Sequence, residues 1–366
     1  MEIKCFKKDL ALVVDKVARI ISSKPSLPAL SGIYIEAEKN KVILKGTNLE
    51  FGIENSFVAD VLDAGTVLVP ASILQRVLKT IKDDEKITLK YKNELFVIST
   101  RNGEMNIKTL DKNEFPKIPQ PDAEDKFTVP VDMFISGIKA VSQSASLSVI
   151  KPELSSVYIY SQNKNIFFVA TDQFRLAEKV FNINKNIEVE SVLIPVINAN
   201  EIVSVLEGFD ADLDVYIEDG QIGIKTNNLY LTSRIIDGSF PDYRAIIPEN
   251  ISTKIVILKE DFQNLMRKMQ IFSDKFGKVT FKIDTENKKF TAISKNADLG
   301  EVTDSPDATI SGESIEISFN HKYLLEALTP IKSDSIELRF SGVGKPLVVK
   351  GVADDSFTYL VMPMNK

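Results

Sequence analysis

The dipeptide Ile194-Pro195 precedes an apolar run, Asn198–Leu206, whose spacing is typical of a helix with one buried face. The same arrangement occurs 125 residues earlier and 125 residues later (195 minus 70; 320 minus 195), as the run Ala71–Ile81 after Val69-Pro70 and the run His321–Leu328 after Phe319-Asn320. A constant long period indicates that one structural unit occurs three times in succession.

Each copy also begins with a helical run of its own. Each run comes after a dipeptide that ends in aspartate. The runs are Leu10–Ile21 after Lys8-Asp9, Phe134–Val141 after Val131-Asp132, and Phe262–Met269 after Glu260-Asp261. The aspartates are predicted to be the N-cap residues of these helices. Stretches of alternating polarity between the helices, with short turns such as Lys92-Asn93 and Asp219-Gly220, predict antiparallel sheets.

The pattern therefore predicts an α+β fold of three similar domains, each with two helices and antiparallel sheets. Pro- and Asn-containing segments near Pro119–Asp122 and Pro248–Ile251 suggest the linkers. The expected domains are residues 1–120, 121–249 and 250–366.

The composition excludes several classes of protein. The chain has 366 residues, of which 44% are hydrophobic, so it can form real cores and is not intrinsically disordered. No apolar run approaches the ~20 residues of a membrane span. Met1–Cys5 contains an acid and no apolar region, so we expect no secretory signal. Cys5 is the single cysteine, which favours a reducing compartment, and we expect the cytoplasm.

The residue counts also argue against common catalytic sites. His321 is the single histidine, and we interpret it as an exposed residue at a helix start. A zinc site almost always needs several His or Cys ligands, which this chain lacks. A catalytic triad that contains histidine would have to use His321. Gly342-Val343-Gly344 lacks the third glycine of a dinucleotide-binding loop, and the acidic stretch Asp210–Asp214 is interpreted as a solvated turn. We expect no metal and no cofactor.

Four motifs in the order of the chain carry a resemblance to a known family. They are Lys24-Pro25-Ser26-Leu27-Pro28-Ala29-Leu30, Ala170-Thr171-Asp172-Gln173-Phe174-Arg175-Leu176-Ala177, Gly238-Ser239-Phe240-Pro241-Asp242-Tyr243 and Tyr359-Leu360-Val361-Met362-Pro363-Met364. Together with the threefold repeat, they resemble the bacterial DNA polymerase III β subunits, which are sliding clamps.

The resemblance implies a fold and a function over the whole chain. It implies three DNA-clamp domains per chain and a head-to-tail homodimer that forms a ring. The ring would encircle duplex DNA without sequence specificity and tether the replicative DNA polymerase, which confers processivity. Further implied partners are an ATP-dependent clamp loader and other proteins with clamp-binding motifs. No catalytic residue, no metal and no membrane are implied.

The resemblance also implies DNA-facing side chains, although the formal net charge is −6. The distribution of charge matters more than the sum. Basic residues lie off the apolar faces of the predicted helices or just after them, and those expected to face DNA are Arg19, Lys24, Arg76, Lys79, Lys82, Lys139, Arg267 and Lys268. This chain has Ser72-Ile73 and Val196-Ile197 where the family commonly has basic residues.

By resemblance, partner peptides bind between the second and third domains. Carried over position by position, the pocket residues are Leu154, Thr171, Gln173, Phe174, Arg175, Leu176, Pro241, Ile246, Asn320, Tyr323, Leu360, Met362, Pro363 and Met364. An apolar pocket with methionines can accept several related peptides. The chain departs from the common family pattern at Pro152-Glu153, at Gln173-Phe174 and at Asn365-Lys366.

The expected dimer contact joins the third domain of one chain to the first domain of the other. Ile271 and Phe272 would form its apolar centre and would meet Met105 and Ile107 on the last strand of the first domain. Edge strands of this kind need to be paired or covered.

Two other functions remain as alternatives. One is an enzyme that uses Asp172 with Arg175, although the counterpart of Asp172 in the first repeat is Asn48, which cannot act as an acid or a base. The other is an acidic peptide-binding adaptor that does not encircle DNA.

Overall fold

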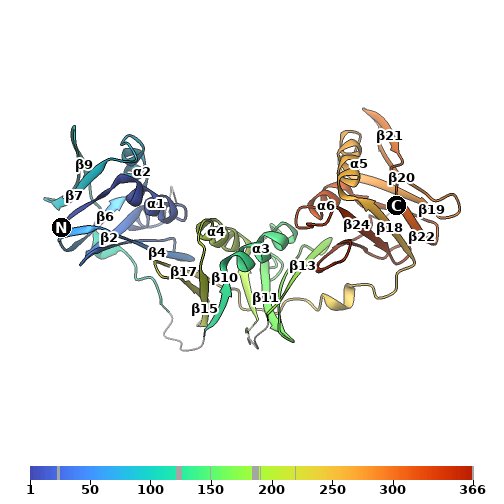
Figure 1. The fold of residues 1–366 in the computed structure, drawn as a ribbon, viewed down its shortest axis with the longest axis horizontal. Coiled ribbons are helices and arrows are strands. Elements are labelled where there is room, and N and C mark those ends of the chain that lie inside the picture. The colour runs from blue at the N-terminus through green and yellow to red at the C-terminus, as the bar shows by residue number, and fades with distance from the viewer. Residues whose placement is uncertain are drawn as a thin grey trace. The chain divides into compact units, whose positions relative to one another are not determined.

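The computed structural model describes residues 1–22, 25–120, 126–148, 150–183, 189, 191–218 and 220–364. Its chain forms two compact units. The first unit contains residues 1–132 and 201–235, and the second contains residues 133–200 and 236–366 (Figure 1). Lys24, part of the predicted linker Pro119–Asp122, Asp219 of the predicted hairpin turn and the terminal Asn365-Lys366 lie outside the described residues.

The described residues contain two α-helices for each of the three repeats, as predicted. They are α1 (Lys7–Ala18), α2 (Ala71–Lys79), α3 (Val131–Val141), α4 (Val196–Leu206), α5 (Lys259–Ile271) and α6 (His321–Glu326). Helix α1 buries Leu10, Val13, Val14 and Val17, which are the positions that the apolar spacing predicts.

The prediction that an aspartate caps each first helix is wrong. The N-cap residues of α1 and α5 are Phe6 and Leu258, neither of which makes a side-chain capping bond. Asp9 and Asp261 lie inside the first turn instead. Both helices follow a strand directly, so the last strand residue takes the cap position. An acid in the first turn still interacts favourably with the helix dipole.

Four sheets contain the described strands, and all their recorded pairings are antiparallel. The two smaller sheets lie in the first and third repeats. The first has the order β5 (Asp60–Asp63), β1 (Glu2–Phe6), β7 (Lys86–Lys92), β8 (Leu95–Thr100) and β9 (Gly103–Lys108). The other has the order β21 (Gly300–Asp304), β20 (Lys289–Asn296), β19 (Lys278–Asp284) and β23 (Ile315–Asn320).

The two larger sheets each contain strands of two repeats. In the first unit the order is β10 (Phe127–Pro130), β15 (Asp212–Glu218), β16 (Gln221–Lys225), β17 (Leu229–Arg234), β4 (Phe51–Val58), β3 (Lys41–Thr47), β2 (Gly32–Glu38) and β6 (Gly65–Pro70). In the second unit it is β14 (Val192–Pro195), β11 (Ser156–Gln162), β12 (Asn165–Thr171), β13 (Arg175–Asn182), β26 (Asp354–Val361), β25 (Leu347–Gly351), β24 (Ser335–Phe340), β18 (Thr253–Leu258) and β22 (Thr309–Gly312).

Two strand pairs therefore join consecutive repeats. Within the first unit, β4 pairs with β17, and Gly52 lies opposite Thr232. Within the second unit, β13 pairs with β26, and Leu176 lies opposite Leu360. The middle repeat thus contributes strands to both large sheets, and backbone hydrogen bonds connect it to each neighbour.

Close packing of a helix on a sheet is visible at α3. The rings of Phe134 on α3 and Phe168 on β12 make an edge-to-face contact with centroids 5.8 Å apart. At Gly137, one turn further along, an added Cβ would come within 2.6 Å of the Phe168 ring. Glycine at this position lets the helix backbone approach the ring.

No described helix is both long enough and apolar enough to cross a membrane.

Candidate functional site

The turn between β12 and β13 presents two predicted pocket residues to solvent. The Thr171 hydroxyl donates a hydrogen bond to the Arg175 carbonyl oxygen at 2.7 Å. Asp172 Oδ1 accepts the backbone N–H groups of Phe174 and Arg175 at 2.9 and 3.0 Å. Gln173 has φ of 78°, in the left-handed region. The ring of Phe174 is 61% exposed, so the turn offers an aromatic surface at the edge of the site.

Arg175 links this turn to helix α6. Its Nε donates to Asp172 Oδ2 at 2.9 Å, and its guanidinium forms an ion pair with Glu326. The guanidinium also lies over the Tyr323 ring, 4.5 Å from the centroid. The Arg175 side chain is 11% exposed, so these charges interact in a partly dehydrated place. The network connects β13 of the second repeat with α6 of the third repeat.

Leu176 and Leu360 form the floor of the site. They lie opposite each other on β13 and β26, and each is 3% exposed. They belong to a cluster of buried side chains whose other members are Phe167, Val169, Tyr243 and Val348. The two leucines are therefore packed side chains of this cluster.

Tyr243 anchors the segment that connects the second repeat to the third. Its hydroxyl donates to Glu178 Oε2 at 2.5 Å and lies 2.6 Å from the Tyr160 hydroxyl. Burial, with the bond to Glu178, raises the pKa of Tyr243. The nearby Phe240 ring stacks on Tyr158 with centroids 4.7 Å apart.

The same segment carries two further predicted pocket residues. Pro241 is exposed, and Ile246 is 45% exposed. The anchored aromatic residues thus hold an exposed proline and isoleucine beside the buried cluster.

The apolar end of the chain is fastened to the same place by backbone hydrogen bonds. The Met362 N–H donates to the Phe174 carbonyl oxygen, and the Met364 N–H donates to the Ser318 carbonyl oxygen, both at 2.8 Å. Met362, Pro363 and Met364 are all half-buried. These residues are ordered against the site and leave part of their apolar surface available.

The start of α6 differs from the expectation at His321. Asn320 is the N-cap residue, and its side chain accepts the Lys322 N–H at 2.9 Å. His321 is 1% exposed, so the interpretation as an exposed residue is wrong. Its Nε2 lies 3.2 Å from the Ser273 hydroxyl, beyond the end of α5, and burial lowers its pKa. Helix α6 packs against α5, which encloses this side chain.

Leu154 is buried in the turn before β11, and its N–H donates to the Lys151 carbonyl oxygen.

Sequence reasoning missed Glu326 and Tyr359 as parts of this site. Glu326 follows Tyr323 by one helical turn, so the two side chains meet Arg175 from the same face of α6. Tyr359 precedes Leu360 on β26, and burial raises its pKa to about 12.

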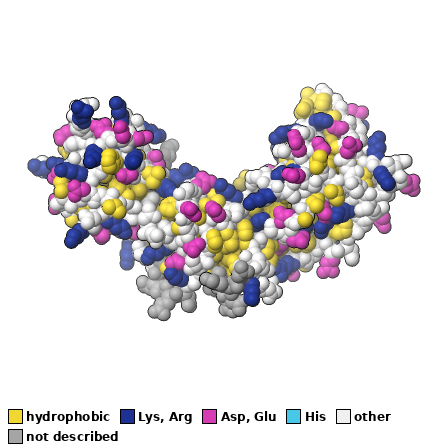
Figure 2. Space-filling view, viewed as in Figure 1, with side chains coloured by type: hydrophobic (Ala, Val, Ile, Leu, Met, Phe, Trp, Pro, Cys, Tyr) yellow, Lys and Arg dark blue, Asp and Glu magenta, His cyan; other side chains and the backbone are white. Residues whose placement is uncertain are grey.

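The basic residues expected to face DNA are in different situations. Arg19 lies 3.6 Å from Glu201, and Lys268 lies 2.6 Å from Asp304. Arg76 Nε donates to the Ser72 carbonyl oxygen at 3.2 Å. The exposed members of this group include Arg76, Lys79, Lys82, Lys139 and Arg267. Figure 2 shows basic and acidic side chains interspersed on the visible face.

A neighbouring lysine on α1 has a structural role. Lys16 Nζ donates to the carbonyl oxygens of Val205 and Glu207 at 3.0 and 3.4 Å and lies 3.8 Å from the centroid of the Phe209 ring. It therefore caps the C-terminal end of α4 within the first unit, and burial lowers its pKa.

The residues predicted for the dimer contact also differ in exposure. Ile271, the last residue of α5, is 64% exposed, and Phe272 is half-buried. Met105 on β9 is half-buried, whereas Ile107 is 3% exposed and belongs to the core of its own repeat. Strands β9 and β21 are each at the edge of their sheet among the described strands.

Asp172, on which the enzyme alternative depends, is held by hydrogen bonds in the structure. Both oxygens of the Asp172 carboxylate already accept hydrogen bonds within the turn and from Arg175. Asn48 makes the same turn bonds in the first repeat, where its Oδ1 accepts the N–H groups of Glu50 and Phe51. The residue therefore shapes a turn. Within the described part of the chain, no cluster of three or more His, Cys, Asp or Glu side chains is suited to a metal ion.

Comparison with protein families gives three consecutive matches. Residues 1–119, 128–242 and 244–365 match the N-terminal, central and C-terminal domains of the DNA polymerase III beta subunit. Among curated relatives, the beta sliding clamps of Staphylococcus epidermidis and Staphylococcus aureus are each 28% identical over 359 residues, which cover 95% of this chain and 94% of theirs.

Solved structures show the same fold. The DNA polymerase sliding clamp of Bacillus subtilis superimposes with a TM-score of 0.94 at 24% identity, covering 100% of this chain and 99% of that one. The DNA polymerase III beta subunit of Pseudomonas aeruginosa superimposes with a TM-score of 0.95 at 22% identity, covering 100% of both chains.

Proposed function

This chain belongs to the family of bacterial DNA polymerase III beta subunits, and from that premise we propose that it is a DNA sliding clamp. A homodimeric ring of this protein encircles duplex DNA and tethers the replicative polymerase. The observation that carries the proposal is the succession of three repeats, each with two helices, that match the three domains of that family in order.

The proposed contact with DNA is weak and independent of sequence. A protein of net charge −6 whose basic side chains are partly engaged in ion pairs makes few phosphate contacts. Few contacts mean low affinity with a shallow salt dependence, which allows the ring to slide. Retention then comes from the closed ring around an unbroken duplex. No chemical step is required, and we assign no catalytic residue.

The proposed partner site lies in the second unit, above Leu176 and Leu360. Its apolar floor, the exposed ring of Phe174 and the half-buried methionines suit the apolar side chains of a short peptide. Such a peptide motif would belong to the replicative polymerase, to an ATP-dependent clamp loader and to other clamp-binding proteins. Tethering raises the effective concentration of the polymerase at the primer end, which confers processivity. We place this activity in the cytoplasm, where chromosomal DNA is replicated.

The proposed ring closes through two identical head-to-tail contacts. Strand β9 of one chain would lie against strand β21 of the partner, so that each edge is covered. Ile271 and Phe272 beside β21 would meet Met105 on β9. Ile107 would support β9 from within its own repeat.

Retention on circular DNA tests this proposal. The protein is loaded onto a nicked circular plasmid with a bacterial clamp loader and ATP, and gel filtration separates bound from free protein. Half of the sample is then cut once with a restriction enzyme, and an equal half is treated with heat-inactivated enzyme. We expect the protein to remain on the intact circles and to leave the linear DNA.

Two results would contradict the proposal. Equal retention on circular and linear DNA would mean ordinary surface binding. Absence from circles, under conditions in which the same loader loads its own clamp, together with a monomeric mass, would favour a peptide-binding adaptor that does not encircle DNA.

A further inference from the structure

The first unit contains a turn that repeats the geometry of the partner site. The Thr47 hydroxyl donates to the Phe51 carbonyl oxygen at 2.9 Å, as the Thr171 hydroxyl does to Arg175 in the second unit. Asn48 takes the place of Asp172, and Leu49 has φ of 77°, as Gln173 has φ of 78°. The side chain of Leu49 is 49% exposed.

The surroundings of this turn are also repeated. Strand β4 pairs with β17 of the next repeat, as β13 pairs with β26. The segment after β9 crosses the sheet, with the Phe115 ring stacked on Tyr34 at 5.2 Å and Ile118 buried. At Gly52 an added Cβ would come within 2.9 Å of Ile118 and Thr232, so the crossing segment lies directly on the sheet.

Two neighbouring cavities border the crossing segment, and together they form a groove. The larger, of about 240 Å³, is lined by residues that include Leu49, Glu50, Pro116, Lys117, Gln221 and Arg234. The smaller, of about 60 Å³, shares Pro119, Gln221 and Thr232 with it.

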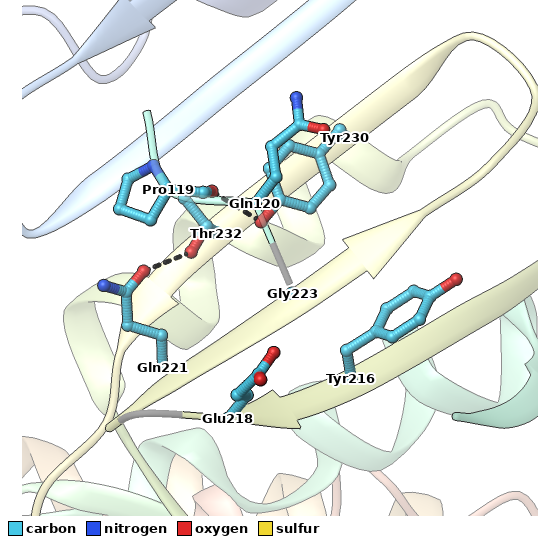
Figure 3. Close-up of a pocket in the computed structure, with 8 residues that line it drawn as sticks. All are labelled: Pro119, Gln120, Tyr216, Glu218, Gln221, Gly223, Tyr230 and Thr232. Atoms are coloured by element: carbon cyan, nitrogen blue, oxygen red, sulfur yellow. Dashed lines mark hydrogen bonds between the residues drawn. The ribbon is translucent and has the colours of Figure 1, made fainter. Parts of the chain in front are cut away.

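Figure 3 shows the smaller cavity, with Pro119 and Gln120 above the strands and Tyr216, Glu218 and Gln221 along them. The Tyr230 hydroxyl donates a hydrogen bond to the Pro119 carbonyl oxygen, and the Thr232 hydroxyl donates one to Gln221 Oε1, both at 2.8 Å. Burial raises the pKa of Tyr230 to about 12. The groove is therefore built on fixed hydrogen bonds.

The chemistry of this groove differs from that of the partner site. Strand register places Gly52 and Thr232 where the second unit has Leu176 and Leu360. Arg234 comes two residues after Thr232, just as Met362 comes two residues after Leu360. The floor of the groove is thus more polar, and a cation takes the place of a methionine.

Two cations at the rim are available to a ligand. Lys117 is exposed. The Arg234 side chain is 62% exposed, and its Nη1 lies 3.8 Å from Glu50 Oε1, which is longer than a hydrogen bond. An exposed pair at this distance contributes little, so a carboxylate that binds Arg234 in a bidentate manner would displace Glu50 at small cost. Leu49 and Pro116 supply apolar surface beside these cations.

We propose that this groove is a second peptide-binding site, which takes an extended segment with an acidic residue next to a leucine. The acidic side chain binds between Lys117 and Arg234, and the leucine lies on Leu49 and Pro116. The occupant is a peptide segment of a partner protein, and its acidic character distinguishes it from the apolar ligand proposed for the second unit. The site does not depend on whether the protein encircles DNA.

The probe is a fluorescein-labelled hexapeptide of sequence Asp-Asp-Leu-Asp-Asp-Leu, which carries a benzophenone group at its N-terminus. Its affinity for the full chain is measured by fluorescence anisotropy, and the benzophenone crosslink is located by mass spectrometry. We expect crosslinks in segments 47–52 or 116–120 and no binding of the matched peptide Lys-Lys-Leu-Lys-Lys-Leu. Arg234→Glu should weaken binding at least about tenfold, as expected for the loss of a charged hydrogen bond.

Lys39→Glu is the matched control, since Lys39 is exposed in the same unit but does not line the groove and its substitution changes the net charge equally. It should leave the affinity within about twofold of the parent chain. Lys117→Glu provides a second variant of the site in case Arg234→Glu alters folding. Crosslinks confined to the partner site of the second unit would overturn the proposal. Equal weakening by Lys39→Glu, absence of binding to the parent chain, or tight binding retained in both rim variants would do the same.

Discussion

Replacement of Ile271 by alanine should weaken the proposed ring while leaving the fold of the chain intact. Ile271 is 64% exposed at the end of α5, so most of its side chain has no contacts within its own chain. A substitution at such a position changes the free energy of unfolding by about 0.5 kcal/mol or less. In the proposed dimer the same surface is buried against β9 of the partner.

The structure sets the size of the effect. The change from isoleucine to alanine removes three carbon atoms, each of which contributes about 0.8 kcal/mol when fully buried. Because 64% of the side chain becomes buried only in the dimer, each contact loses about 1.5 kcal/mol. A closed head-to-tail dimer contains this contact twice, so the loss is about 3 kcal/mol, or roughly a hundredfold in the dissociation constant.

Sedimentation velocity over a series of protein concentrations measures this constant directly. Val343→Ala is the matched control, because Val343 is also an exposed apolar residue, 75% exposed, outside the proposed contact. Urea unfolding of both variants shows whether the fold is retained. The reasoning would be refuted by a dissociation constant for Ile271→Ala that matches those of the parent chain and the control, or by a parent chain that is monomeric throughout.

Three further predictions concern the second unit. Phe174→Ala should weaken binding of a polymerase-derived peptide in an anisotropy assay and leave the free energy of unfolding within about 0.5 kcal/mol, because the ring is 61% exposed; unchanged affinity would remove Phe174 from the site. Gln173→Gly should raise the urea midpoint slightly, because relief of about 1–2 kcal/mol of left-handed strain exceeds the entropic cost of glycine of about 0.5–1 kcal/mol; a lower midpoint would show that the Gln173 side chain stabilises the turn. Burial lowers the folded-state pKa of His321, so the unfolded chain binds more protons in mild acid and the free energy of unfolding should fall as the pH drops below about 6.5. His321→Gln should flatten this dependence between about pH 7 and 5.5 in urea titrations, and an unchanged slope would assign it to other groups.

Local patterns in the chain were sufficient to predict the helices and the antiparallel strands. The apolar spacing of Leu10, Val13, Val14 and Val17 predicts the buried face of α1, and the structure confirms it. The constant spacing of Pro70, Pro195 and Asn320 predicts the threefold repeat, which the family matches confirm. Helix and strand patterns depend on residues close together in the chain, and a repeat depends on similar segments at a constant spacing, so a sequence records both directly.

Contacts between distant residues could not be predicted in this way. The ion pair of Arg175 with Glu326 joins two repeats, and nothing in the sequence near either residue indicates the other. His321 lies at the start of a helix, where a polar residue is usually exposed, but packing of α6 on α5 buries it. The aspartates expected as caps lie one or more positions inside their helices because a strand runs directly into each helix.

The sequence by itself determined the number of repeats, their helices and the family to which the chain belongs. The tertiary structure alone decided that the middle repeat contributes strands to both large sheets, through the pairs Gly52–Thr232 and Leu176–Leu360. It also decided that one junction has an apolar floor and the other a polar groove with Lys117 and Arg234 at its rim. The physical reason is that strand pairing between repeats is a long-range choice of register, which becomes visible only when backbone hydrogen bonds bring distant segments together.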